Sequence, residues 1–131
     1  MEMPLEPRVI NFKRIIDPRG QLCFTEFQHE IPFEVKRIYW INEMPENQKR
    51  GGHAHRTDIQ LIVRLLGKAK VRLESTQDEE FTVRLESAHQ GLIIPPMWWG
   101  EMEFSHQAVL LGMASEVFDE EDYIRDKADF Q

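Results

Sequence analysis

The chain has 131 residues, of which 41% are hydrophobic and 30% are charged, and its formal net charge is −7. This length and composition are typical of one globular domain and unlike those of a disordered chain. The acidic balance argues against binding to nucleic acid or to an anionic membrane surface, although local arginines could still bind an anionic ligand. We therefore expect a single domain over 1–131 with neither kind of partner.

Cysteine usage and the N-terminal segment favour a cytoplasmic location. The one cysteine, Cys23, cannot form a disulfide within the chain, as suits a reducing compartment. Residues 1–11 lack the apolar core of a signal peptide, and no apolar run approaches membrane-spanning length. We expect a soluble protein.

The N-terminal part predicts a hairpin followed by a third strand. Residues 8–16 and 21–27 have strand character, and the segment Asp17–Gly20 between them favours a turn because it contains a proline and a glycine. The next strand is expected over 35–42. Its alternation places Arg37, Tyr39 and Ile41 on one face, and Ile38 and Trp40 on the other.

The remaining chain continues as short strands separated by turn residues. Strands are expected around the two histidines and over 61–66, 68–74, 81–85, 92–94 and 108–113, with an aromatic segment over 97–104. Asp119 resembles a helix N-cap with acidic residues after it, so we expect one short helix over 119–130. The pattern predicts an all-β fold, a small antiparallel β-barrel or jelly roll with a short C-terminal helix.

His53 and His55 are the residues that point most directly to a function. Two side chains at positions i and i+2 of a strand lie on the same face, about 6.5–7 Å apart along the backbone, whereas on a helix they would point apart. A pair of imidazoles facing the interior of a small barrel makes either a metal site or an acid/base site.

A metal site needs more ligands than the sequence offers in the expected places. Gln60 is a weak ligand, and Asp58 is offset by one residue from the expected face. After Pro95 and Pro96, where a third histidine would be expected, the chain has Trp98, Trp99 and Gly100. These features disfavour a bound metal, and we predict none.

An acid/base site requires fewer assumptions. One imidazole can transfer a proton near neutral pH while the second orients it. Tyr39 could polarise a carbonyl or relay a proton, and it shares its face with Arg37. Arg19 and Arg50 could bind phosphate or carboxylate groups. Trp98 and Trp99 could stack on a base or sugar.

Each of these residues also has an ordinary structural interpretation. Tyr39 could be a core tyrosine with its hydroxyl at the rim, and both tryptophans could fill the core. Arg19, in a hairpin turn, would by default be a solvated charge. Arg37 could pair with one of the many acidic residues.

Five segments together resemble the cupin-type dTDP-4-oxo-6-deoxyglucose 3,4-ketoisomerases. These enzymes take part in the biosynthesis of deoxysugars for surface polysaccharides. The matching segments are INFKRIIDPRGQL, IPFEVKRIYWI, RGGHAHRTDIQLIVRLLGKAKVRLE, GLIIPPMWWGEMEF without its Gly100 and Glu103, and ASEVFDEEDYIRDKADF without its Lys127. They cover nearly the whole chain in order. The combination of RGGHAH with the terminal EDYIRD is much more specific than a bare cupin pattern.

The resemblance implies a cupin barrel, a homodimer that exchanges N-terminal strands, and a reaction without metal or other cofactor. The keto group of a dTDP-4-keto-6-deoxyglucose-like nucleotide sugar would move from C4 to C3 through an enediol. His53 matches the proton-transferring base, His55 the second histidine and Tyr39 an active-site tyrosine. The remaining matches are substrate-binding positions: Arg19, Arg50 and Gln60, to which we add Arg37 and Trp99 as candidates.

Two positions depart from the family pattern. Gly100 stands where the family carries a histidine or an arginine that faces the sugar, and Trp40 follows Tyr39 in place of another tyrosine. Gly100 leaves the product configuration at C4 open. Two other functions therefore stay open: a non-catalytic nucleotide-sugar-binding cupin and a metal-dependent cupin enzyme. A dTDP-sugar 3,5-epimerase fits the histidine spacing and the length less well.

Overall fold

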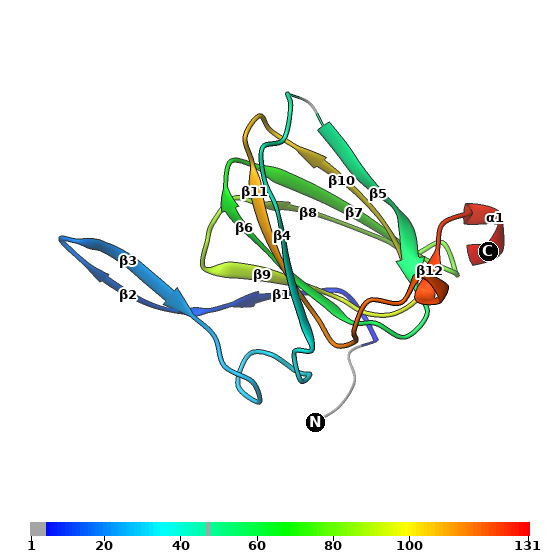
Figure 1. Cartoon of the computed structure of the whole chain (residues 1–131), viewed down its shortest axis with the longest axis horizontal. Helices are drawn as coiled ribbons and strands as arrows, with labels where there is room; N and C mark the ends of the chain where they lie inside the picture. The colour runs from blue at the N-terminus through cyan, green and yellow to red at the C-terminus, as the bar shows by residue number, and fades with distance from the viewer. Residues whose placement is uncertain (1–4, 47) are drawn as a thin grey trace.

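Two antiparallel sheets face each other in the computed structural model, which describes residues 5–46 and 48–131 (Figure 1). The first has the order β1 (Arg8–Asn11), β9 (Gln90–Ile94), β6 (Gln60–Leu66), β11 (Val109–Ala114), β4 (Arg37–Ile41). The second has the order β12 (Tyr123–Ile124), β5 (Gln48–His55), β10 (Trp98–Phe104), β7 (Ala69–Ser75), β8 (Glu80–Leu85). This arrangement confirms the all-β prediction.

The space between the sheets is filled by side chains that alternate inward along each strand. Ile62, Leu92 and Leu110 from the first sheet meet Val71 and Leu73 from the second, and each is at most 1% exposed. Burying an aliphatic side chain of this size stabilises the fold by about 1.5–3 kcal/mol. This cluster closes one part of the barrel and leaves the rest for a cavity.

The outer face of the first sheet is covered as well. Phe12, Ile31 and Phe33 pack there against Leu61 and Ile93. A sheet that is buried on both faces needs a continuous apolar run instead of alternation. This explains why residues 59–63 are apolar or buried throughout.

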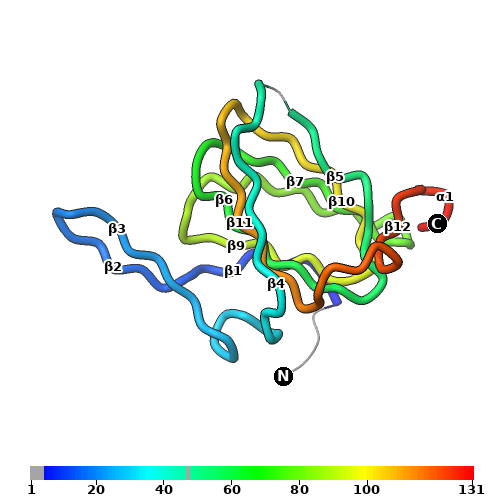
Figure 2. The backbone as a smooth tube through the Cα atoms, in the orientation of Figure 1, coloured from blue at the N-terminus to red at the C-terminus, as the bar shows by residue number. Residues whose placement is uncertain are grey.

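An arm formed by β2 (Lys13–Asp17) and β3 (Gly20–Phe24) extends away from the barrel (Figures 1 and 2). The predicted hairpin is therefore confirmed, but residues 8–16 form two strands and not one. Phe12 interrupts them because its ring is buried and its backbone N–H donates to the carbonyl of His89 at 2.7 Å. The arm exposes Ile15, Ile16 and Leu22.

The predicted short C-terminal helix is confirmed, but it is confined to one turn and does not extend over 119–130. The segment forms a 3₁₀ turn, η1 (Glu120–Asp122), the short strand β12 and a single helical turn, α1 (Lys127–Phe130). Ile124 and Phe130 are buried against Trp99, and β12 pairs with β5, so packing and pairing override the local helical signal. Asp119 does cap η1, as expected, by accepting from the backbone N–H of Glu121. Over the ranges described above, the structure contains no helix with the length and apolar character to cross a membrane.

Candidate active site

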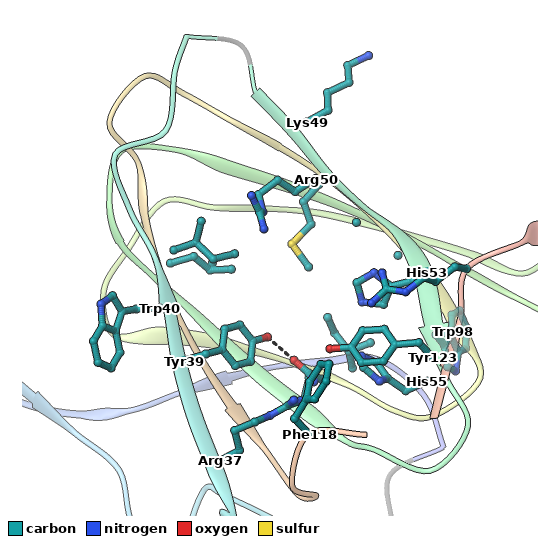
Figure 3. Close-up of a pocket in the computed structure, with 18 residues that line it drawn as sticks. Arg37, Tyr39, Trp40, Lys49, Arg50, His53, His55, Trp98, Phe118 and Tyr123 are labelled. Atoms are coloured by element: carbon teal, nitrogen blue, oxygen red, sulfur yellow. Dashed lines mark hydrogen bonds between the residues drawn. The ribbon is translucent and has the colours of Figure 1, made fainter. Parts of the chain in front are cut away.

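A cavity of about 750 Å³ opens between the two sheets and is closed at one side by the C-terminal tail (Figure 3). Its volume lies within the usual range for small-ligand sites. Its walls come from β4, β5, β6, β9, β10, β11 and the tail. The polar and aromatic side chains that matter most below are those of Arg37, Tyr39, Arg50, His53, His55, Gln60, Trp98, Phe118, Tyr123 and Arg125, and Gly100 also lies in the wall.

Strand β5 brings both histidines to this cavity, as predicted. Their ring centroids are 5.0 Å apart and the rings are nearly perpendicular. Gly51 and Gly52 both have positive φ. In the pairing with β10, Gly100 lies opposite His53 and Glu101 lies opposite Gly51, so Gly52 is left without a partner residue. This β-bulge re-aims the strand, so that Arg50 also lines the cavity although a regular strand would turn it away from His53.

The surroundings of the histidines keep both rings neutral. Burial, and then the neighbouring His55 and Arg125, lower the pKa of His53 to about 4. Burial also lowers the pKa of His55, although Asp58 and Asp122 act in the opposite direction. Near pH 7 the cavity therefore contains two imidazoles with free lone pairs, the form that a general base requires.

His55, Asp58 and Asp122 lie close enough together to be considered as metal ligands. The two carboxylates, however, already accept hydrogen bonds on every oxygen. Asp58 accepts from Ser115 and the Glu116 N–H on one oxygen, and from Gln60 at 2.9 Å and Arg37 at 3.0 Å on the other. A guanidinium in that position repels a cation, so this donor set does not fit a metal ion. Asp58 reaches His55 because residues 56–58 turn away from the strand direction assumed for them.

Tyr39 projects from β4 into the cavity and donates a hydrogen bond to the side-chain carbonyl of Gln60 (Figure 3). Burial raises the pKa of Tyr39, so the phenol keeps its proton. Its ring lies over Gly112, the residue directly opposite on β11, where any Cβ atom would overlap the ring. The predicted alternation along β4 is confirmed: Trp40 also borders the cavity, but it is exposed, and Figure 3 shows its ring on the opposite side of β4 from Tyr39.

The tail adds site residues that the sequence analysis did not identify. The Tyr123 ring packs 5.2 Å from His53 and 4.4 Å from His55, measured between ring centroids. Asp122 lies 3.2 Å from Nδ1 of His55, and Arg125 also lines the cavity. These residues belong to the EDYIRD segment, whose specificity signalled a role, but the expected helix would have directed them elsewhere.

Two proposed substrate-binding residues lie outside this cavity. Trp99 points to the other face of β10 and packs against Phe130, because alternation directs Trp98 and Gly100 inward. Arg19 lies at the tip of the arm, with its side chain 90% exposed and 2.7 Å from Asp17. Within one chain, neither side chain contributes to the cavity wall.

The charge of the cavity is opposite to that of the whole chain. Among the described residues that line it, Arg37, Lys49, Arg50 and Arg125 are cationic and none is a carboxylate. Three of these cations are paired with carboxylates outside the lining, which are Asp58, Glu103 and Glu120. A cavity with walls of one charge concentrates the field and attracts ligands of the other sign. The site is therefore suited to an anionic ligand despite a net charge of −7.

Comparison with known proteins supports one family. The family model described as "FdtA: WxcM-like, C-terminal" matches residues 5–131. The TDP-4-oxo-6-deoxy-alpha-D-glucose-3,4-oxoisomerase of Aneurinibacillus thermoaerophilus is 40% identical over 128 residues, which are 97% of this chain and 91% of that protein.

Solved structures agree in fold and sequence. QdtA, a sugar 3,4-ketoisomerase from Thermoanaerobacterium thermosaccharolyticum in complex with TDP, superposes with a TM-score of 0.90 at 39% identity, over 98% of this chain and 93% of that one. A histidine-to-asparagine variant of QdtA in complex with TDP-4-keto-6-deoxyglucose also gives a TM-score of 0.90, at 38% identity and the same coverage.

The neutral histidines predict a specific pH dependence of stability. The pKa of His53 is lowered from 6.5 to about 4 on folding, so between these values the unfolded chain binds more protons than the folded one. The free energy of unfolding should therefore decrease as the pH falls through this window, by up to about 1.4 kcal/mol per pH unit for one histidine. Urea unfolding at several pH values would measure the slope. His53→Asn should make the dependence of unfolding free energy on pH less steep, whereas His106→Asn, on the surface, should leave it unchanged. Equal slopes for the unmodified protein and both variants would contradict the lowered pKa of His53.

The contact between Gly112 and Tyr39 predicts a strong coupling between these positions. Gly112→Ala should displace the Tyr39 ring and cost about 1–3 kcal/mol of unfolding free energy through overpacking. In a Tyr39→Ala background the same alanine should cost little, because the ring is gone. A double-mutant cycle by urea unfolding measures this coupling, and strictly additive costs would show that the ring does not depend on Gly112.

Proposed function

We propose, on the premise that this chain belongs to the FdtA, WxcM-like family, that it is a sugar-nucleotide 3,4-ketoisomerase. Its substrate would be a TDP-linked 4-keto-6-deoxyhexose, and its reaction would move the keto group from C4 to C3. The observation that carries the proposal is the pair of neutral imidazoles on one wall of a cationic cavity.

The reaction defines what the site must do. The hydrogen on C3 must be transferred to C4, and the hydrogen on the C3 oxygen must be transferred to the C4 oxygen. An enediol joins the two halves: a base removes the C3 proton, the C4 oxygen is protonated, and the sequence then runs in reverse on the other carbon. A hydrogen beside a ketone is weakly acidic, so the site needs both a positioned base and a group that stabilises the developing enolate.

The side chains in the cavity can be assigned to these steps. His53 is our candidate for the base at carbon, because its ring is neutral and is the less enclosed of the two imidazoles. Tyr39, which keeps its proton, and His55 lie within the same cavity and could serve the oxygens. Gln60 accepts from Tyr39 and donates to Asp58, so its contribution would be to hold the phenol in place.

The nucleotide would be held by the cations. Arg50 and Lys49 follow one another on β5 beyond the bulge, on the side of the cavity away from Tyr123 (Figure 3). A diphosphate carries the negative charge for which these side chains are suited. Arg37 is 3.0 Å from Asp58, which offsets its charge, so it would act mainly by holding that carboxylate in place.

Gly100 affects the configuration of the product at C4. It pairs with His53 across β5 and β10, and a Cβ atom there would lie 3.2 Å from Cδ2 of Leu73. Without a side chain, this wall offers no donor to the sugar, and the face on which C4 is reprotonated would depend on the remaining groups. The same feature keeps a second function open, a cupin that binds the nucleotide sugar without converting it.

We also propose that the active unit is a homodimer in which the N-terminal arms are exchanged, acting in the cytoplasm. The arm carries exposed Ile15, Ile16, Leu22 and Phe24, an apolar surface that a second copy would cover. Arg19 at its tip would then be brought to the partner's cavity. This arrangement would reconcile its proposed role with its position in one chain.

Turnover and proton exchange test the proposed activity together. Proton NMR of TDP-4-keto-6-deoxyglucose with the protein in heavy water should show a 3-keto isomer and deuterium in the ring. His53→Asn should lower the rate at least about 100-fold, the contribution typical of a general base, whereas His106→Asn should not. Binding of the TDP-sugar with its ring hydrogens intact after long incubation would favour the non-catalytic function instead.

Mixing two inactive variants tests the exchanged arm. If Arg19 acts in the partner's cavity, Arg19→Ala and His53→Asn subunits, unfolded and refolded together, should form mixed dimers with one complete site each. Part of the activity should then return, although each variant alone has lost it. No recovery, in a sample shown by light scattering to contain dimers of twice 15.6 kDa, would place Arg19 outside the site or in its own chain's site.

A further inference from the structure

We propose that Asp122 is a positioning residue that holds His55 as the tautomer with its proton on Nδ1, and so directs the lone pair of Nε2 to the cavity. The proposal deepens the function proposed above and rests on it. It concerns the second histidine, whose task in the reaction the cavity geometry alone leaves undefined.

The carboxylate of Asp122 is fixed by the turn that follows β5. One of its oxygens accepts from the backbone N–H and the hydroxyl of Thr57, at 2.8 and 2.7 Å. The other accepts from the backbone N–H of Asp58 at 3.2 Å. Burial acts to raise the pKa of Asp122, but these hydrogen bonds and the adjacent His55 lower it overall, so the carboxylate is ionised near pH 7.

An ionised carboxylate can only accept hydrogen bonds. Nδ1 of His55 lies 3.2 Å from the second oxygen of Asp122, and the side chain of His55 is 7% exposed. This nitrogen must therefore carry the proton of the neutral ring. Nε2, on the other side of the ring, is then the unprotonated nitrogen and the one free to accept.

The other groups around His55 are consistent with this assignment. The nearest oxygen of Asp58 is more distant from Nδ1, at 3.9 Å, and already accepts from Arg37. His53 packs at right angles to His55, and Tyr123 covers the His55 ring at 4.4 Å between centroids. Packing therefore fixes the orientation of the His55 ring, and Asp122 fixes the position of its proton on Nδ1.

This pair suits the transfer of the proton that is bound to oxygen. As His53 removes the proton from C3, Nε2 of His55 can accept the proton of the C3 hydroxyl, and the imidazolium so formed lies beside the Asp122 carboxylate, which stabilises it. When His55 gives this proton to the C4 oxygen, the starting tautomer is restored, and His53 delivers its own proton to C4. No other reactant is consumed, and His53 remains available for the proton at carbon.

The tail that carries Asp122 is firmly attached. Arg56 donates from its backbone to the carbonyl of Asp122 at 2.9 Å, and from its side chain to the carbonyls of Glu121 and Tyr123. Ile124 and Phe130 bury their side chains beyond it. A positioning residue needs such support, because small displacements of a catalytic group reduce the rate steeply.

The first measurement uses the unmodified protein labelled with ¹⁵N-histidine, near neutral pH, with His55→Gln to assign the signals. The nitrogen shifts of His55 should show the proton on Nδ1. In Asp122→Asn the side-chain amide has one acceptor oxygen where the carboxylate has two, so it cannot accept from both Thr57 and His55. The proton of the His55 ring should then move to Nε2 or distribute between both nitrogens. A proton on Nε2 in the unmodified protein would overturn the proposal, whether or not any variant folds.

Kinetics supply the second measurement. Asp122→Asn should lower kcat about 10- to 100-fold, within the range of acid–base contributions, while KM changes little. Thr57→Val, which removes one donor and keeps the carboxylate, should give a smaller decrease. Asp119→Asn is the matched control: it makes the same chemical change in the same turn, and asparagine also caps helices, so its kcat should equal that of the unmodified protein.

The outcomes separate the two proposals. A normal kcat for folded Asp122→Asn would overturn the positioning role and leave the isomerase intact. No turnover by the unmodified protein on TDP-4-keto sugars would overturn the isomerase, and the tautomer of His55 would then alone decide whether Asp122 holds the ring.

Discussion

The site depends on the removal of two imidazoles from water. Both histidines of β5 lie inside the barrel, and burial disfavours their charged forms. The resulting neutral rings have lone pairs available for protons, but they lose hydration that something must replace. For His55 the replacement is the turn 56–58 and the tail, which present Asp58 and Asp122 to one edge of the ring. The same contacts that stabilise the buried ring therefore determine which of its nitrogens can react.

Charge is distributed unevenly between the surface and the cavity. Acidic residues outnumber basic ones by 23 to 16 over the chain, yet the described lining of the cavity is cationic. Whole-chain charge disfavours a polyanionic surface partner, because such a partner contacts the exterior. A small anion inside the barrel responds to the few side chains within a Debye length of it. Both statements are compatible because they concern different surfaces.

Much of this arrangement follows from residues that act by lacking a side chain. Gly112 provides the space over which Tyr39 lies, and Gly51 and Gly52 form the bulge that aligns Arg50 with His53. At Gly51 a Cβ atom would lie 2.7 Å from the carbonyl oxygen of Gly100, so the strands could not approach as they do. Such requirements concern distances between strands, and no local pattern of hydropathy or propensity reports them.

The sequence by itself determined the strand alternation and the shared face of His53 and His55, because these depend on a period of two along a single strand. It also determined the N-terminal hairpin and the all-β class, because these follow from turn residues, such as the proline and glycine of Asp17–Gly20, placed between short strands. Its match to a known family was sufficient to indicate an isomerase. The tertiary structure alone decided the placement of Trp99 away from the cavity, of Arg19 at the end of an arm, and of Asp122 beside His55. The tail has the local pattern of one helix over 119–130, but the pairing of β12 with β5 restricts the helix to the last turn, which ends on the buried Phe130. Long-range contacts of this kind can outweigh the helix propensity of a segment. They cannot be inferred from the segment alone, because they form only when the whole chain is folded.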